Sequence, residues 1–487
     1  MAKTLKACGR NARTLAASLA VVSLAACNFA PHYEKPQLTS PTPSAYKEMG
    51  PWTPAVPADD APRNTWWLAY GDKRLNDLET QLISGNPDLA AALHRYDEAR
   101  AYESQAAAAQ YPQIGAEGYS TANKQSQNRP LRLPTGKNYY GDNLAGGTAS
   151  YEVDIWGRVR NMVAAGKAEA QASKADIGTV RLMLQAELAD DYLNLRGLDA
   201  QEDLLRRTVV DYQEALNLTE DRYHGGADPE LYVEEAKTQL QTAEAQETDV
   251  KAQRALMEHA IAVLVGVPAS SFSLAATTTL PPPITVPVST PSVLLERRPD
   301  VAAAERRVFA ANRQIGVTRA AFFPSIALTA GGGFENAGGN NLLAASNSFW
   351  TLGPSLAVSV FDGGYRRARV NESKALLNQA ADAYKSIVLT AFQEVEDNLA
   401  LCNDLAVEAK QQDEAVVSAR NSESLALFRY EQGATTYLDV ITAQNFELTA
   451  ERADIEVATR RLVASVDLVR ALGGDWQGMS EKVPAHT

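Results

Sequence analysis

Cysteine is nearly absent from this chain, which contains only three among its 487 residues. Cys8 and Cys27 fall at the start, where a leader is expected, and Cys402 is the third. Because only Cys402 remains in the rest of the chain, no intrachain disulfide can form there. A disulfide-stapled scaffold is therefore excluded.

Histidine is also scarce, and the chemistry-bearing patterns of enzymes are missing. The five histidines stand at positions 32, 94, 224, 259 and 486, without an HExxH or a paired metal-ligand spacing. The glycines 331–333 lie in a predicted strand rather than between a strand and a helix, so they are not a phosphate loop. We expect a protein that is not an enzyme and that holds no metal or non-covalent cofactor.

An apolar run of about 20 residues, as a membrane-spanning helix needs, is missing from the leader. Its apolar run, 15–26, is shorter and follows four basic residues, which is typical of a secretory signal. The run ends Leu24-Ala25-Ala26-Cys27, which resembles a bacterial lipobox. That resemblance implies removal of 1–26 and acylation of Cys27 by an S-diacylglycerol and an N-acyl chain such as palmitate. An ordinary cleavage site is the alternative. In such lipoproteins of enteric bacteria an Asp after the cysteine favours retention in the inner membrane; Asn28 stands there instead, so the resemblance implies the outer membrane.

Negative charge exceeds positive charge. The formal net charge is −13, and removal of the basic leader makes it about −17. Such acidity argues against a nucleic-acid partner.

Two segments rich in proline divide the chain, one at 28–64 and one at 280–291. We expect the first to be an extended tether. The predicted parts are a lipoprotein signal peptide at 1–26, an acylated tether and equatorial segment at 27–85, a first structural repeat at 86–280, a linker at 281–297, a second repeat at 298–473 and a tail at 474–487.

An internal duplication joins the two repeats. NPDLAAALHRYDEAR, from Asn86, matches RPDVAAAERRVFAAN, from Arg298, at an offset of 212. RYHGGA, from Arg222, matches RYEQGA, from Arg429, at an offset of 207. Two matches in the same order with nearly equal offsets indicate two similar structural halves.

Each half contains two predicted strands, at about 113–124 and 143–155 in the first and at about 325–335 and 350–361 in the second. Apolar and polar residues alternate in them, as in Ala149, Tyr151 and Val153 against Ser150 and Glu152. Segments of about ten residues with one apolar face are typical of membrane β-barrels, and a soluble sheet is the alternative.

A very long helix without proline follows each strand pair, at about 157–223 and 364–430. Apolar residues recur in it at spacings of three and four. A returning helix is expected at about 228–266 and 435–473, after a glycine-containing turn. Such lengths favour coiled-coil-like hairpins over a compact globule.

Four strands are too few to close a membrane barrel, because the smallest have about eight. An open sheet edge in lipid would leave backbone groups without hydrogen-bond partners. If these strands span a membrane, several chains must share one barrel.

These segments resemble TolC-like outer-membrane factors, specifically the NodT subgroup of lipoproteins that serve resistance-nodulation-division efflux pumps. The resemblance is carried by LLERRPDVAAAERRVFAANRQIGVTRAAFFPSIALTAGGGF, YEVDIWGRVR, VFDGGYRRARV and RYEQGATTYLDVITAQ. It implies a mixed α and β membrane protein, with a trimeric 12-stranded barrel continued by a periplasmic helical barrel. A periplasmic adaptor, an inner-membrane transporter and outer-membrane lipid are the implied partners.

The family places its gate at the periplasmic helix turns. The resemblance implies that the gate lies at Arg429, Tyr430, Leu438, Asp439 and Thr442, with Arg222, Tyr223, Gly226 and Gly433 at the turns or the adaptor contact. Leu438 matches an apolar constriction. Thr442 stands where an Asp ring is common, so Asp439 is the candidate acid, and a merely solvated Asp439 is the alternative.

Three functions are compatible with the sequence. The first is a gated exit duct for drugs or other small molecules. The second is a non-conducting periplasmic scaffold lipoprotein, and the third is a duct for peptide or protein secretion.

Overall fold

The computed structural model describes residues 28–48, 65–128, 137–284, 297–338 and 341–474. The signal peptide, Cys27, most of the tail and parts of the tether and linker lie outside the described residues. The chain divides into two compact units. The first holds residues up to Pro36 with 95–173 and 303–384, and the second holds 37–94, 174–302 and the remainder from 385.

The same order of elements occurs twice along the chain. The elements are η1 (Trp66–Tyr70), α2 (Lys73–Gly85), α3 (Pro87–Ala108), β1 (Gln113–Lys124), β2 (Tyr139–Glu152), α4 (Arg158–His224), α5 (Glu230–Leu264), η2 (Ala269–Ser271), α7 (Pro299–Ala320), β3 (Ser325–Asn336), η3 (Ala345–Asn347), β4 (Ser348–Ala357), α8 (Tyr365–Glu431) and α9 (Tyr437–Ala471). In both halves a 22-residue helix precedes the strand pair, and 67-residue and 35-residue helices follow it.

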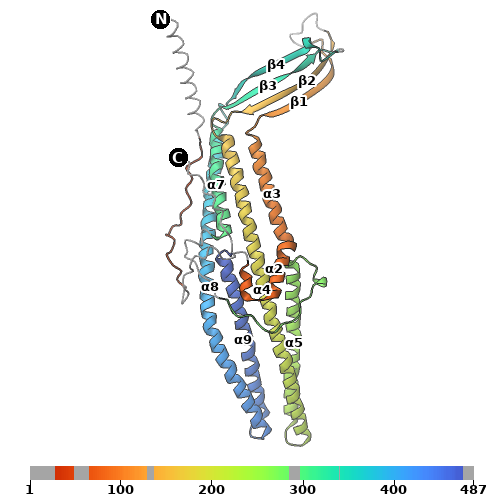
Figure 1. Cartoon of the computed structure of the whole chain (residues 1–487), viewed down its shortest axis with the longest axis vertical. Helices are drawn as coiled ribbons and strands as arrows, with labels where there is room; N and C mark the ends of the chain where they lie inside the picture. The colour runs from red at the N-terminus through yellow and green to blue at the C-terminus, as the bar shows by residue number, and fades with distance from the viewer. Residues whose placement is uncertain (1–27, 49–64, 129–136, 285–296, 339–340, 475–487) are drawn as a thin grey trace. The chain divides into compact units, whose positions relative to one another are not determined.

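The first unit is built on one antiparallel sheet with the strand order β1-β2-β3-β4 (Figure 1). The two repeats meet at its centre, where Thr148 of β2 pairs with Gly331 of β3. Among the described residues, β1 and β4 each have a single neighbouring strand, so each leaves one edge of the sheet unpaired. Backbone groups on such an edge need hydrogen-bond partners from outside the four strands.

Two predicted strands were placed slightly wrongly. β4 ends at Ala357 rather than at residue 361, because Ala357 pairs with Ser325, the first residue of β3 after Pro324. β2 covers Tyr139–Glu152 rather than 143–155, because it pairs with β1 as far as Lys124, opposite Tyr139. The alternation of apolar and polar residues therefore identified the strands, whereas pairing with neighbouring strands sets where each strand begins and ends.

Apolar side chains stand exposed on the sheet. On β4, Trp350 is 81% exposed and Leu352 and Leu356 are about two-thirds exposed, at positions that share one face. At the β2–β3 pair the backbones approach so closely that a Cβ on Gly333 would lie 2.3 Å from the carbonyl oxygen of Ala145. An uncovered apolar face suits strands that contact lipid, whereas the two unpaired edges would have to pair with further strands there.

The second unit is helical. α4 with α5, and α8 with α9, form antiparallel hairpins (Figure 1). A cluster of buried side chains lies near the turns, contributed by both hairpins: Tyr212, Leu216, Val233, Ala236, Leu240, Ala243, Tyr430, Tyr437 and Val440. No helix in the part of the chain that the structure describes is long and apolar enough to cross a membrane.

The duplication is also visible in one repeated contact of the second unit. The side-chain nitrogen of Asn86 donates to the carbonyl oxygen of Leu264 at 2.8 Å, at the end of α5. Its counterpart Arg298 donates to the carbonyl oxygen of Ala471 at 3.0 Å, at the end of α9. Arg298 is buried and also pairs with Asp300 at 2.7 Å. The contact to the end of the returning helix is thus made by a side-chain amide in the first repeat and by an arginine with acidic partners in the second.

Candidate gate at the hairpin turns

The two hairpin turns have the same backbone geometry. Gly226 has φ 73° and Gly433 has φ 70°, both in the left-handed region that favours glycine. In the first turn the amide of Ala227 donates to the carbonyl oxygen of Arg222 at 2.8 Å, and in the second Ala434 donates to that of Arg429 at the same distance. The predicted turn glycines therefore close the ends of α4 and α8.

The side chains at these turns are not equivalent. Tyr430 is 1% exposed, whereas its counterpart Tyr223 is 38% exposed. Arg222 is partly buried, whereas its counterpart Arg429 is exposed. Only one tyrosine and one arginine of the predicted set are therefore brought together, and they come from different repeats.

Asp228 is the residue that joins them. Its carboxylate accepts a hydrogen bond from Arg222 Nε at 2.7 Å and another from the hydroxyl of Tyr430. The guanidinium of Arg222 also lies over the ring of Tyr430, 4.8 Å from its centroid. Burial raises the pKa of Asp228, but the hydrogen bonds from Arg222 and Tyr430 outweigh it, so the pKa lies below its ordinary value. We call Arg222, Asp228 and Tyr430 the tip lock.

Asp228 was not among the residues predicted from the sequence. Its counterpart at an offset of 207 is Thr435, so the duplication gave no reason to single it out. The available signal was a carboxylate immediately after the glycine turn and just before α5, where an acid suits the helix dipole. That signal alone names no partner.

Asp439 acts within its own helix. Its Oδ2 accepts from the amide of Thr436 at 3.2 Å, while the side chain of Thr436 accepts from the amide of Asp439, which makes a capping box at the start of α9. The hydroxyl of Thr436 also donates to Oδ2 at 3.0 Å. Hydrogen bonds from Thr435 and Thr436, together with the charge of Arg429, lower the pKa of Asp439. The side chain is exposed, and so is Thr442, whose hydroxyl donates to the carbonyl oxygen of Leu438 at 2.8 Å.

Leu438 lies in an apolar groove. It is 58% exposed, and Leu231, its counterpart in the first repeat, is 61% exposed. Both line a groove of about 600 Å³ between α5 and α9, to which Tyr212 of α4 also contributes. An exposed leucine from each repeat in one groove is suited to an apolar constriction.

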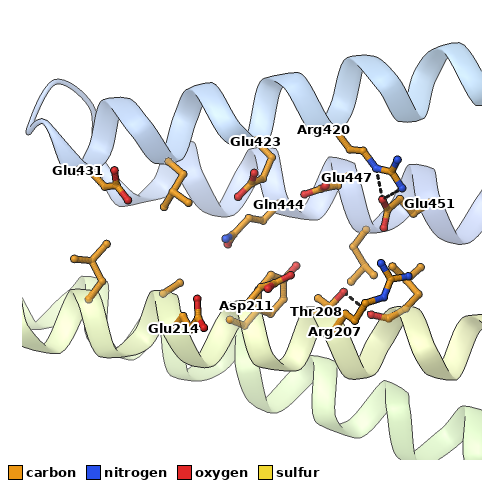
Figure 2. A pocket seen from close by; sticks show the side chains of 16 residues that line it. Arg207, Thr208, Asp211, Glu214, Arg420, Glu423, Glu431, Gln444, Glu447 and Glu451 are labelled. Carbon is orange, nitrogen blue, oxygen red and sulfur yellow. Dashed lines mark hydrogen bonds and ion pairs between the residues drawn. The ribbon is translucent and has the colours of Figure 1, made fainter.

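A second hollow, of about 720 Å³, lies where α4 faces α8 and α9, and it is acidic (Figure 2). Glu423 and Glu447 point into it from one side and Asp211 from the other, as Figure 2 shows. Burial, and then the charges of Glu423 and Glu451, raise the pKa of Glu447 to about 7. Arg420 offsets part of this charge through its bond to Glu451 at 2.5 Å.

Fold and site together define a class of protein. The sheet has exposed apolar side chains and unpaired edges, and it is joined to two 67-residue helices, one in each repeat. This architecture is typical of a subunit of an outer-membrane channel with a large periplasmic helical part.

Comparisons with known proteins identify the family. The family model described as "Outer membrane efflux protein" matches residues 78–267 and 290–474, once in each repeat. Outer membrane protein OprJ of Pseudomonas aeruginosa is 31% identical over 467 residues, which cover 95% of this chain and 96% of that protein. Cation efflux system protein CusC of Escherichia coli O6:H1 is 28% identical, covering 94% and 97%. The solved structure of the outer-membrane channel OprN matches with a TM-score of 0.82 and 28% identity, covering 91% of this chain and 99% of that one.

The chain therefore belongs to the outer membrane efflux protein family. The predicted family of outer-membrane efflux channels, the barrel-plus-helical-tunnel fold and the location in the outer membrane of Gram-negative bacteria are confirmed. The relatives are channel and efflux proteins rather than enzymes, which supports the predicted efflux duct over the alternative of a non-conducting scaffold.

Proposed function

We propose that three copies of this chain form one exit duct, with four strands from each completing a 12-stranded barrel. The observation that carries this proposal is the pair of unpaired sheet edges on β1 and β4. In lipid each edge must pair with another strand, and a second copy offers the complementary edge. With four strands in each chain, three chains give the predicted 12 strands.

In this proposal the duct receives its cargo from an inner-membrane resistance-nodulation-division transporter through a periplasmic adaptor, and it performs no catalysis. We assign it drugs or other small molecules. Relatives carry the names cation efflux protein CusC and toluene efflux pump protein TtgF, so one duct architecture serves different cargo. Selection then belongs to the transporter. Cys27 carries the lipid anchor, and no other cofactor is needed.

The gate is the hairpin-turn region, and the tip lock holds it closed. Arg222 and Asp228 belong to the first hairpin and Tyr430 to the second, so the lock fixes the two hairpins of one chain to each other. Opening requires the hairpins to move apart, which breaks these hydrogen bonds. Adaptor binding supplies the free energy by contacting the opened arrangement better than the closed one.

The apolar narrowing is assigned to Leu438, with Leu231 beside it in the same groove. Asp439 is assigned to the helix cap rather than to a free acidic ring, because its Oδ2 already accepts hydrogen bonds from Thr435 and Thr436. Arg429 and Thr442 remain exposed neighbours of this narrowing.

The test is copurification of the full-length protein with its adaptor and transporter from the native membrane, together with drug sensitivity after deletion of the gene. Recovery of both partners and increased sensitivity support the duct. A protein that purifies without either partner and whose loss changes no sensitivity would contradict it.

A further inference from the structure

The residues that follow Cys27 are held by a built site on α7 and the start of α4. We call residues 28–36 the strap; they contain no helix or strand. All of these residues and their partners belong to the first unit.

Phe29 makes the central contact. Its ring stacks on Phe323 with centroids 4.5 Å apart and an angle of 7° between the planes. Phe323 stacks in turn on Trp156 at 4.8 Å. Trp156 lies between β2 and α4, and Phe323 between α7 and β3, so the three rings join both crossings from sheet to helix. The indole nitrogen of Trp156 donates to the carbonyl oxygen of Pro324 at 2.8 Å, which fixes the two crossings to each other.

Polar contacts hold the backbone carbonyl of Phe29 and the side chain of Asn28 before it. Arg319 donates to the carbonyl oxygen of Phe29 at 3.1 Å. The buried side chain of Asn161 donates to Oδ1 of Asn28 at 2.9 Å. Gly316 lets the strap lie close to α7, since a Cβ at this position would lie only 2.9 Å from the amide nitrogen of Ala30.

A second contact lies further along the strap. The ring of Tyr33 meets Phe309 edge-on at 5.1 Å, and its hydroxyl donates to Glu305 at 3.3 Å. Lys35 pairs with the same Glu305 at 3.8 Å. Strap residues therefore contact α7 in reverse order, from Arg319 near its end to Glu305 near its beginning.

The spacing leaves little slack. From Phe29 to Lys35 an extended chain covers about 20 Å at ~3.3 Å per residue. From Arg319 to Glu305 a helix covers about 21 Å at ~1.5 Å per residue. The near equality means that the strap can hold one register on α7, and a shift by one residue would displace both aromatic contacts.

We propose that the strap is a docking element that fixes the mature N-terminus beside the crossings from strand to helix. Cys27 is bonded to Asn28, so an acyl group on Cys27 begins two residues from the ring stack. The strap thus sets the level of the lipid anchor relative to the ends of the membrane strands. Docking itself stands independently of acylation, whereas this membrane consequence rests on the proposed lipid at Cys27.

Photo-crosslinking in outer-membrane vesicles tests the register. With p-benzoylphenylalanine in place of Phe29, the expected product joins the strap to the peptide that carries Phe323 or Trp156. The exposed His32 position, replaced in the same way, is the control and should not give that product. Crosslinks from position 29 to lipid alone, or to other parts of the chain, would overturn the proposal.

Limited proteolysis after the exposed Glu34 tests the strength of docking in the full chain. Phe323→Ala should accelerate this cleavage on the order of tenfold, because the docked strap must detach before the protease binds. Phe29→Ala should do the same from the strap side, and it leaves the crossings intact. Phe322→Ala is the matched control, because the ring of Phe322 contacts Arg366 instead.

Equal cleavage in all four proteins would overturn the strap. The mass of the released fragment, which begins at residue 27, reports acylation separately. An unmodified fragment together with accelerated cleavage in Phe323→Ala would retain docking and remove only its role in placing a lipid.

Discussion

The tip lock gives the sharpest functional prediction. Tyr430→Phe removes a single hydroxyl and keeps a ring of the same shape in the buried cluster. The lost hydrogen bond has an ionised acceptor, and such bonds contribute about 1.5–3 kcal/mol. Because the side chains of Arg222 and Asp228 are only 23% and 8% exposed, solvent screening reduces this little, and about 2 kcal/mol per chain is expected.

A shift of about 2 kcal/mol changes the ratio of closed to open hairpins by roughly 30-fold in each chain. In planar bilayers without adaptor, Tyr430→Phe should therefore increase the open probability strongly, and Asp228→Asn should increase it at least as much. Tyr223→Phe is the matched control, since it makes the same change at the exposed counterpart. Open probabilities of Tyr430→Phe and Tyr223→Phe that both equal the wild-type value would refute the lock.

Three further predictions concern the narrowing and the helical unit. Leu438→Ser should increase single-channel conductance in planar bilayers, with Leu231→Ser as the comparison in the other repeat; unchanged conductance would reject Leu438 as the constriction. Burial raises the pKa of Glu79 to about 9, and neither carboxyl oxygen has a hydrogen-bond partner. Since the folded state keeps a proton that the unfolded state loses above its ordinary pKa of about 4.5, stability falls as pH rises from there to about 9, by about 3 kcal/mol at pH 7. Glu79→Gln should flatten this dependence in thermal unfolding at pH 5 and pH 8, whereas the exposed Glu98→Gln should not; parallel curves for the two variants would contradict the assignment. Arg298→Met should lower the free energy of unfolding by about 3 kcal/mol, because it leaves partly buried Asp300 and Glu394 without their counter-ion. Arg369→Met is the control and should have little effect, because the ion pair that it removes is exposed.

The long helices of this chain and the turns between them could be predicted from the sequence. Absence of proline over 67 residues and helical periodicity placed α4 and α8 within one residue of their bounds. The turn glycines placed the turns of the hairpins. The repeated Pro-Asp pair placed the first residues of α3 and α7. These signals are local, because each depends on neighbours within one or two helical turns.

Features that depend on particular contacts between residues, most of them far apart in the sequence, could not be predicted. The end of β4 is set by Ser325, which the alternation of β4 itself does not indicate. Asp228 and Tyr430 are 202 residues apart in sequence, and the duplication pointed to Tyr223 instead. Asp439 is an acid within the predicted gate, yet its side chain accepts a hydrogen bond from the amide of Thr436 and thereby caps α9. In each case a tertiary or local contact overrides the sequence pattern.

Native mass spectrometry of the detergent-extracted protein measures the number of chains in one channel directly. The unpaired edges of β1 and β4 predict an assembly of three chains that also conducts ions after reconstitution into a planar bilayer. A single chain that conducts, with its sheet closed on itself, would contradict the shared barrel.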